Sequence, residues 1–186
     1  MSRKPDIEVT IEITQYCDRH CPFCSTDATV HGRHLPIRTI KEFLQKTAER
    51  YHIARLNLSG GEPLAHPAFY KILKFCETIV PFGYIYVYTN ALNNIIFNTE
   101  VMNGINIEAN VPLCYGQPII PKNVSQIHLL KLVEQGRCTK DMIPPITVSS
   151  NLASEHECSK CNNILLQADG TVVQAPCKKT YGRRKD

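Results

Sequence analysis

The sequence lacks long apolar runs, and it also lacks the apolar segment of a signal peptide. No stretch of its 186 residues approaches the roughly 20 consecutive apolar residues that a membrane-spanning helix needs. The start, Met1-Ser-Arg-Lys-Pro-Asp-Ile-Glu-Val, contains no apolar targeting core. These absences predict a cytoplasmic protein with no membrane partner.

The body of the chain also lacks net charge. Residues 178–186 hold five basic residues and one aspartate, which account for the whole formal charge of +4 and leave residues 1–177 neutral. Proteins that bind nucleic acid carry a basic surface that neutralises phosphates, and a neutral body offers none. We therefore expect no nucleic-acid partner and interpret the basic tail as a solvated terminus.

The chain is too short for a complete eight-stranded α/β barrel, which takes about 250 residues. Strand-like segments nevertheless alternate with helix-like ones, which predicts parallel βαβ units. The expected strands are 7–14, 54–58, 84–89, 105–110 and 146–149, and the expected helices are 37–51, one beginning near Pro67, and 124–136. The predicted fold class is α/β, a partial, open barrel of about five to six parallel units within residues 1–152.

Cysteine, in contrast, is plentiful. Three of the nine cysteines form the pattern Cys17-x-x-x-Cys21-x-x-Cys24 directly after the first expected strand. In a chain without a secretory signal, such closely spaced thiols indicate a metal site and not a set of disulfide bonds. An iron–sulfur cube with four irons usually takes four cysteines, so three leave one iron open. A zinc site is the alternative. Cys76, on an apolar helical stripe, is expected in the core.

A second motif, Ser59-Gly60-Gly61-Glu62-Pro63, follows the second expected strand. Its glycines allow a ligand to approach the backbone closely, and its composition predicts a turn that ends the strand. Because both motifs follow parallel strands, we expect them at the carboxyl edge of the sheet, where α/β barrels carry their active sites.

Together the two motifs resemble those of the radical S-adenosylmethionine (radical SAM) superfamily, over residues from about Ile7 to Ser149. The resemblance implies that Cys17, Cys21 and Cys24 hold a 4Fe-4S cluster whose open iron binds S-adenosylmethionine. One electron from a low-potential donor, such as flavodoxin or ferredoxin, then yields methionine and a 5′-deoxyadenosyl radical that abstracts hydrogen from a substrate. The cofactor carries the chemistry, and the protein orients it.

The same resemblance implies further contacts with S-adenosylmethionine. The Gly-Gly-Glu-Pro backbone binds its amino group, with the negative charge of Glu62 close by, and Phe23 lies against its adenine. Glu108 and Asn110 are candidates for the ribose hydroxyls. The remaining cofactor-binding candidates lie at the ends of expected strands: Ser59, Gly60, Gly61, Pro63, Thr89 and Asn90.

Near the C-terminus, Asp169-Gly170 separates two β-rich runs, which predicts a hairpin with a two-residue turn. With that turn, Ala168 pairs with Thr171. Counting outward from this pair, Cys177 falls opposite Asn162. The turn therefore predicts that the last of the cysteines returns to the start of the hairpin.

This pairing gathers Cys158, Cys161 and Cys177 within an extension formed by residues 153–186. The extension resembles the SPASM and twitch extensions that carry an auxiliary iron–sulfur cluster, although its Gly170-to-Cys177 spacing is longer and later cysteines are missing. A zinc half-site, or three cysteines with no metal, are the alternatives. The candidates for a fourth ligand are Cys138, Cys114, His156, substrate and solvent.

Three functions follow as hypotheses. The first is a radical SAM enzyme of peptide or protein maturation, because such extensions are common in superfamily members that modify peptides, although a small-molecule substrate stays open. The second is an activase that installs a glycyl radical on a partner enzyme, which suits a small, open barrel. The third is a non-enzymatic zinc or iron–sulfur binding module.

Overall fold

The structure is a computed structural model that describes most of the first half of the chain and parts of the second. The described residues are 3–19, 21–24, 26–81, 83–90, 105–112, 126–130, 137, 139–142 and 162–174, with only the backbone described for 107–112 and 126–130. Within these ranges, no helix has the length and apolar character needed to cross a membrane. The predicted strand at 146–149 and the predicted boundary after residue 152 lie outside them.

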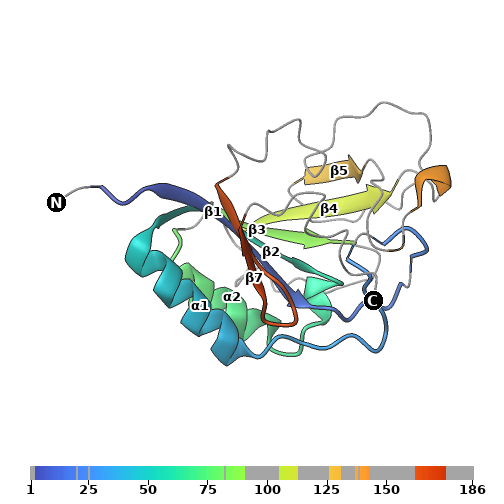
Figure 1. The fold of residues 1–186 in the computed structure, drawn as a ribbon, viewed down its shortest axis with the longest axis horizontal. Coiled ribbons are helices and arrows are strands. Elements are labelled where there is room, and N and C mark those ends of the chain that lie inside the picture. The colour runs from blue at the N-terminus through green and yellow to red at the C-terminus, as the bar shows by residue number, and fades with distance from the viewer. Residues whose placement is uncertain are drawn as a thin grey trace.

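The described strands form one seven-stranded sheet in the order β5-β4-β3-β2-β1-β6-β7 (Figure 1). All neighbouring strands are parallel except β6 and β7, which form an antiparallel pair. The described strands do not close on themselves, so the predicted open α/β architecture is confirmed. The strands are β1 (Asp6–Thr14), β2 (His52–Gly60), β3 (Ile85–Thr89), β4 (Asn106–Pro112), β5 (Gln126–Leu130), β6 (Asn163–Leu166) and β7 (Val172–Gln174).

The described α-helices pack on one face of this sheet (Figure 1). The helices are α1 (Ile37–Arg50), α2 (Phe69–Glu77) and two 3-10 helices, η1 (Pro63–Ala65) and η3 (Lys140–Met142). Strand β1 alternates, and its Val9, Ile11 and Ile13 are completely buried in the core beneath the helices. Cys76 of α2 is also completely buried, and this burial raises the pKa of its thiol to about 12. The prediction that Cys76 is a core residue is therefore confirmed.

Residues Gln126–Leu130 form strand β5, so the helix predicted over 124–136 is wrong at these positions. Their backbone pairs in parallel with β4, from Glu108 opposite Gln126 to Pro112 opposite Leu130. A short apolar run such as Ile-His-Leu-Leu fits a buried strand and a helix about equally well. Pairing with the otherwise open edge of β4 decides between them, and nothing local to the run encodes that partner.

Strand β2 continues through Ser59 and Gly60, which the sequence motif predicts to lie in a turn. Ser59 stands opposite Glu12, and Gly60 stands opposite Thr14 after a local irregularity in β1. Gly60 has a φ of 131°, a conformation that a side chain disfavours. The chain therefore leaves the strand two residues later than predicted, in direct contact with the end of β1.

The predicted C-terminal hairpin is confirmed, but its predicted register is wrong by one residue. Leu166 pairs with Val172, and the Gln167 amide donates to the Thr171 carbonyl at 2.8 Å. Three residues, Ala168, Asp169 and Gly170, therefore form the loop, with Gly170 at a φ of 90°. A loop that ends in a left-handed glycine is the usual three-residue alternative to the two-residue turn. The predicted pairing of Ala168 with Thr171 does not occur.

The hairpin extends the main sheet at its second edge. Strand β6 runs parallel to β1, with Ile164 opposite Val9 and Leu166 opposite Ile11. Leu166 joins the core with these residues. The first strand of the chain is thereby flanked on both sides, by β2 and by a segment about 150 residues later in the sequence.

Candidate functional site

The three clustered cysteines lie in the loop between β1 and α1, at the carboxyl end of β1. The Gln15 amide donates to the Arg33 carbonyl at 2.8 Å and the Cys17 amide donates to the Thr29 carbonyl at 2.9 Å. The loop thus folds back on itself in a ladder that continues β1. Cys17 is buried, Cys21 and Cys24 are half-buried, and all three are free of disulfide bonds.

This set of donors fits a 4Fe-4S cluster. Free thiols on one loop are the soft ligands that iron–sulfur clusters take. Among the described residues, no three His, Cys, Asp or Glu side chains surround one point as ligands of a single ion would. Ligands of a cube bind different irons and therefore lie farther apart than ligands of one ion. The loop supplies three thiols, which is one fewer than a fully ligated cube needs.

Cys17 occupies the most enclosed position of the three. Burial raises the pKa of its thiol above the ordinary value, and the nearby carboxylates of Glu62 and Asp18 add to that shift. The Asn90 side-chain amide, from the end of β3, approaches the Cys17 sulfur at 3.8 Å. A thiol in this environment keeps its proton until a metal displaces it, so metal binding at Cys17 releases a proton.

The Cys24 sulfur sits among donors within its own loop. It accepts a hydrogen bond from the Ala28 amide at 3.4 Å, and it lies 3.4 Å from the Thr26 hydroxyl oxygen. The Cys24 amide donates to the Cys21 carbonyl at 3.2 Å, which forms a tight turn between the two cysteines. Hydrogen bonds to cluster sulfurs are among the features that tune the reduction potential of an iron–sulfur centre.

The Gly60-Gly61 pair brings the end of β2 against the start of the cysteine loop. The Gly61 amide donates to the Thr14 carbonyl at 2.7 Å, and the Glu62 amide donates to the Tyr16 carbonyl at 2.8 Å. A Cβ atom on Gly61 would overlap the Tyr16 carbonyl oxygen. The motif predicts glycines that admit a ligand, whereas here they also admit the backbone of the loop itself.

Glu62 is completely buried, and its hydrogen bonds link the end of β2 to the end of β3. Its carboxylate accepts from the Leu64 amide at 3.1 Å, the Thr89 hydroxyl at 2.7 Å and the Asn90 amide at 2.9 Å. Burial raises its pKa above the ordinary value, against the lowering effect of these donors. Thr89 and Asn90, which the sequence predicts to be cofactor-binding residues, thus meet Glu62 at one edge of the sheet.

The other predicted site residues are distributed around this edge. Phe23 is half-buried between Cys21 and Cys24, and Ser59 is half-buried at the end of β2. Pro63 is buried as the first residue of η1. Glu108 and Asn110 belong to β4, whose side chains the structure does not describe. The remaining predicted ligands lie outside the described residues: Cys158, Cys161, Cys177, Cys138, Cys114 and His156.

Two histidines near the loop have a structural role that the sequence did not reveal. The His34 ring lies 2.9 Å from the Thr14 hydroxyl and 5.0 Å, centroid to centroid, from the His66 ring. His66 is buried, which lowers its pKa. Its Nδ1 accepts from the Ala68 amide, so its Nε2 carries the proton and donates to the Leu35 carbonyl at 3.0 Å. The neutral ring thereby joins η1 to the start of α1.

The sheet face turned away from the helices carries a polar network. Arg55, which alternates with the core residues of β2, stacks over the Tyr86 ring at 3.7 Å. Its guanidinium donates to the Asn57 side chain at 3.0 Å and to the Tyr88 hydroxyl at 2.7 Å. Asn57 in turn donates to Glu8 at 2.7 Å. These groups make this face of the described sheet polar on three adjacent strands.

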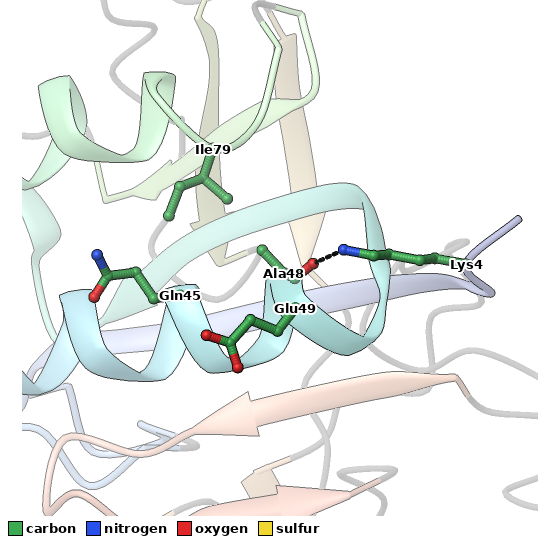
Figure 2. A pocket seen from close by; sticks show the side chains of 5 residues that line it. All are labelled: Lys4, Gln45, Ala48, Glu49 and Ile79. Carbon is green, nitrogen blue, oxygen red and sulfur yellow. Dashed lines mark hydrogen bonds between the residues drawn. The ribbon is translucent and has the colours of Figure 1, made fainter. Parts of the chain in front are cut away.

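A separate surface hollow of about 530 Å³ lies on the helical side of the molecule (Figure 2). Lys4, Gln45, Ala48, Glu49 and Ile79 line it. Lys4 lies at one side of it and donates to the Ala48 carbonyl at 2.6 Å. Because Lys4 precedes β1 and the cysteines follow that strand, the hollow is remote from the cysteine loop.

Comparison with known proteins gives a family match over more than half of the chain. The sequence model described as Radical SAM superfamily matches residues 11–109. A PqqA peptide cyclase from Bradyrhizobium diazoefficiens is 26% identical over 113 residues, which is 60% of this chain and 27% of that protein. The chain thus spans only about a quarter of that curated relative.

Two solved structures share the fold over nearly the whole chain. BtrN in complex with AdoMet and 2-DOIA has a TM-score of 0.63 at 16% identity, and the alignment covers 98% of this chain and 77% of BtrN. Streptococcus suis SuiB bound to S-adenosylmethionine has a TM-score of 0.59 at 13% identity, covering 98% of this chain and 63% of SuiB. At these identities the likeness establishes the open α/β fold.

The contact between β2 and the cysteine loop predicts an unequal response to alanine at two glycines. Gly61→Ala is expected to lower the free energy of unfolding by about 3 kcal/mol, because two backbones must separate. Gly83→Ala is the control for backbone strain without a clash, because its φ of 88° disfavours a side chain, a strain that Gly61 does not carry, but nothing lies within 4 Å of the added Cβ. The control is expected to cost about 1 kcal/mol. Equal urea-unfolding midpoints for the two variants would contradict this contact.

The buried carboxyl of Glu62 predicts a pH-dependent stability of the cluster-free protein. Its pKa is raised in the folded state, whereas the unfolded chain has the ordinary value. Between the two values the folded protein holds a proton that the unfolded chain has released, so the free energy of unfolding falls as pH rises through that window. Glu62→Gln is expected to remove this part of the slope in urea unfolding at a series of pH values. Identical slopes for both proteins would show that Glu62 does not contribute.

Proposed function

The chain belongs to the radical SAM superfamily, and we propose that it cleaves S-adenosylmethionine reductively at a 4Fe-4S cluster held by Cys17, Cys21 and Cys24. The observation that carries the proposal is the placement of three thiols without disulfide bonds on one loop, directly against the Gly-Gly-Glu-Pro end of β2. Such a cluster, when bound, supplies the electron that divides S-adenosylmethionine into methionine and a 5′-deoxyadenosyl radical. We propose that a low-potential donor such as flavodoxin or ferredoxin reduces the cluster, and that the protein is cytoplasmic.

The residues around the loop have separable roles in this proposal. The amides of Gly61 and Glu62 donate to the loop, and backbone carbonyl oxygens of this segment are proposed to accept from the S-adenosylmethionine ammonium. Glu62 acts through its bonds to Thr89 and Asn90, which hold the β3 end beside Cys17. Phe23 is assigned to the adenine. Ser59, Pro63, Glu108 and Asn110 complete the proposed cofactor-binding edge.

For the substrate, we propose a peptide or protein that the enzyme modifies by hydrogen abstraction. The support is the sequence likeness to a PqqA peptide cyclase, a protein named for its action on a peptide. The sheet face around Arg55 and Tyr88 is polar, as a surface that contacts a peptide backbone would be. Among the described strands, the sheet ends at β5 and does not close into a barrel.

We further propose that Cys158, Cys161 and Cys177 hold a second iron–sulfur cluster in an extension formed by residues 153–186. In sequence, Cys161 and Cys177 flank the described hairpin. Asn162, the residue after Cys161, accepts from the Glu8 amide in the amino-terminal half of β1, whereas Cys17 follows the carboxyl end. The six residue-to-residue steps of strand from Glu8 to Thr14 span about 20 Å. The two clusters are therefore proposed as separate sites that load independently.

The cleavage reaction tests the first cluster. After anaerobic loading with iron and sulfide, the protein with S-adenosylmethionine and dithionite is expected to form 5′-deoxyadenosine, measured by liquid chromatography. Cys17→Ala, Cys21→Ala and Cys24→Ala are each expected to abolish it, because each removes an iron ligand. Cys76→Ala is the matched control and is expected to retain it, because Cys76 lies in the core. A colourless wild type with zinc and no sulfide would instead support the non-enzymatic binding module.

Iron and sulfide counts test the second cluster. The loaded wild type is expected to hold about eight irons per chain, and Cys161→Ala about four, because a cube holds four. The same variant is expected to keep 5′-deoxyadenosine formation in the absence of substrate. If the wild type holds about four irons per chain and Cys161→Ala holds the same number, the proposal of a second cluster is wrong.

A further inference from the structure

Arg137 contacts the cysteine loop from a distant part of the sequence. We propose that it is a positioning residue that holds this loop closed and sets the charge beside the cluster. The inference rests on the proposed function, because it assigns Arg137 a role toward the cluster that Cys17, Cys21 and Cys24 are proposed to bind. Neither cysteine motif points to it, and the sequence between β5 and η3 carries no signal that would single it out.

The contacts of Arg137 engage every nitrogen that its side chain and backbone offer. Its Nε and Nη2 donate to the Cys21 carbonyl at 3.1 and 3.0 Å, and Nη2 also donates to the Ala28 carbonyl at 2.9 Å. Its Nη1 donates to the Asp27 carboxylate at 2.6 Å. Its backbone amide donates to the Cys24 carbonyl at 3.0 Å. Five bonds from one residue thus converge on the loop segment from Cys21 to Ala28.

This geometry closes the loop at both ends. One nitrogen, Nη2, bonds both Cys21 and Ala28, so the two ends of the segment are held at a single point. The Ala28 amide is the donor to the Cys24 sulfur, so fixing Ala28 also fixes a hydrogen bond to a proposed ligand. Asp27 has a φ of 55°, a left-handed conformation that aspartate tolerates better than most residues. The planar guanidinium suits such multiple acceptors, whereas a lysine ammonium does not.

Arg137 also places a permanent positive charge beside the loop. Its side chain is 21% exposed, compared with 57% for Asp27, so its charge is partly shielded from solvent and only partly balanced. Reduction of a cluster adds one negative charge to it. A neighbouring cation favours that step, and charge near a cluster is one of the factors that set its potential. Removing the charge should therefore make the cluster harder to reduce.

The two effects of Arg137 can be separated by substitution. Arg137→Gln removes both the charge and the guanidinium fork, and Arg137→Lys keeps the charge but loses the fork. Asp27→Asn keeps the fork on the carbonyls and removes the opposing carboxylate. Arg38→Gln is the matched control, because Arg38 forms a similar 2.7 Å pair with Glu42 on the exposed surface of α1. Thermal unfolding of each variant shows whether it is folded.

The experiment measures iron release to a chelator and the midpoint potential of the cluster by EPR-monitored titration, in the Cys161→Ala background so that one cluster contributes. Arg137→Gln is expected to lose iron about tenfold faster and to shift the midpoint to a more negative potential. Arg137→Lys is expected to lose iron as quickly as Arg137→Gln, while its midpoint potential stays near that of the wild type. Asp27→Asn is expected to shift the midpoint in the opposite, more positive direction, and it tests the charge effect if Arg137→Gln does not fold.

The outcomes distinguish this inference from the proposed function. If the unsubstituted loop binds a cluster and Arg137→Gln matches Arg38→Gln in iron release and potential, the positioning role is wrong and the proposed function stands. If Arg137→Gln releases iron faster with an unchanged midpoint, and Asp27→Asn leaves the midpoint unchanged as well, the charge effect is wrong. If the unsubstituted loop binds no cluster, the proposed function fails and the inference fails with it.

Discussion

The direct backbone contact between the end of β2 and the start of the cysteine loop is the constraint on which the site depends. The Gly61 and Glu62 amides donate to carbonyl oxygens of Thr14 and Tyr16, and no side chain could stand between them. This contact fixes where the loop leaves β1. It also directs the chain so that Glu62 turns inward to β3. The ends of β1 and β2 are thereby joined through backbone groups, and the Glu62 carboxylate adds the end of β3.

A buried carboxylate continues that junction at a cost in free energy. Removing a carboxylate from water is unfavourable unless hydrogen bonds replace those to solvent. At Glu62 three donors from Leu64, Thr89 and Asn90 do so, and the pKa remains raised despite them. A remaining free-energy cost of burial is typical of a carboxylate whose role is to position its hydrogen-bond donors. Glu62 holds Asn90 beside Cys17 and couples the cysteine loop to the centre of the sheet.

Much of the fold was predictable because its elements are locally encoded. The alternation of residues 7–14 matches β1, and the apolar stripe of residues 37–51 matches α1 within one residue. Prediction failed where a partner decides the outcome. Gln126–Leu130 became a strand because β4 presents an open edge. The hairpin register moved by one residue because Asp169 does not adopt the positive φ that a two-residue Asp-Gly turn requires, and a three-residue loop ending in left-handed Gly170 forms instead.

The site also divides into features encoded locally in the sequence and features that depend on distant partners. Its family, its three thiol donors and its Gly-Gly-Glu-Pro segment are determined by the sequence, because each depends on residue types at short spacings along one loop. Only the tertiary structure decided that Glu62 binds Thr89 and Asn90 and that β6 lies beside β1. It also decided that Arg137 bonds the loop of Cys21 and Cys24. The physical reason is that burial and hydrogen-bond pairing depend on neighbours far along the chain, and no local pattern names them.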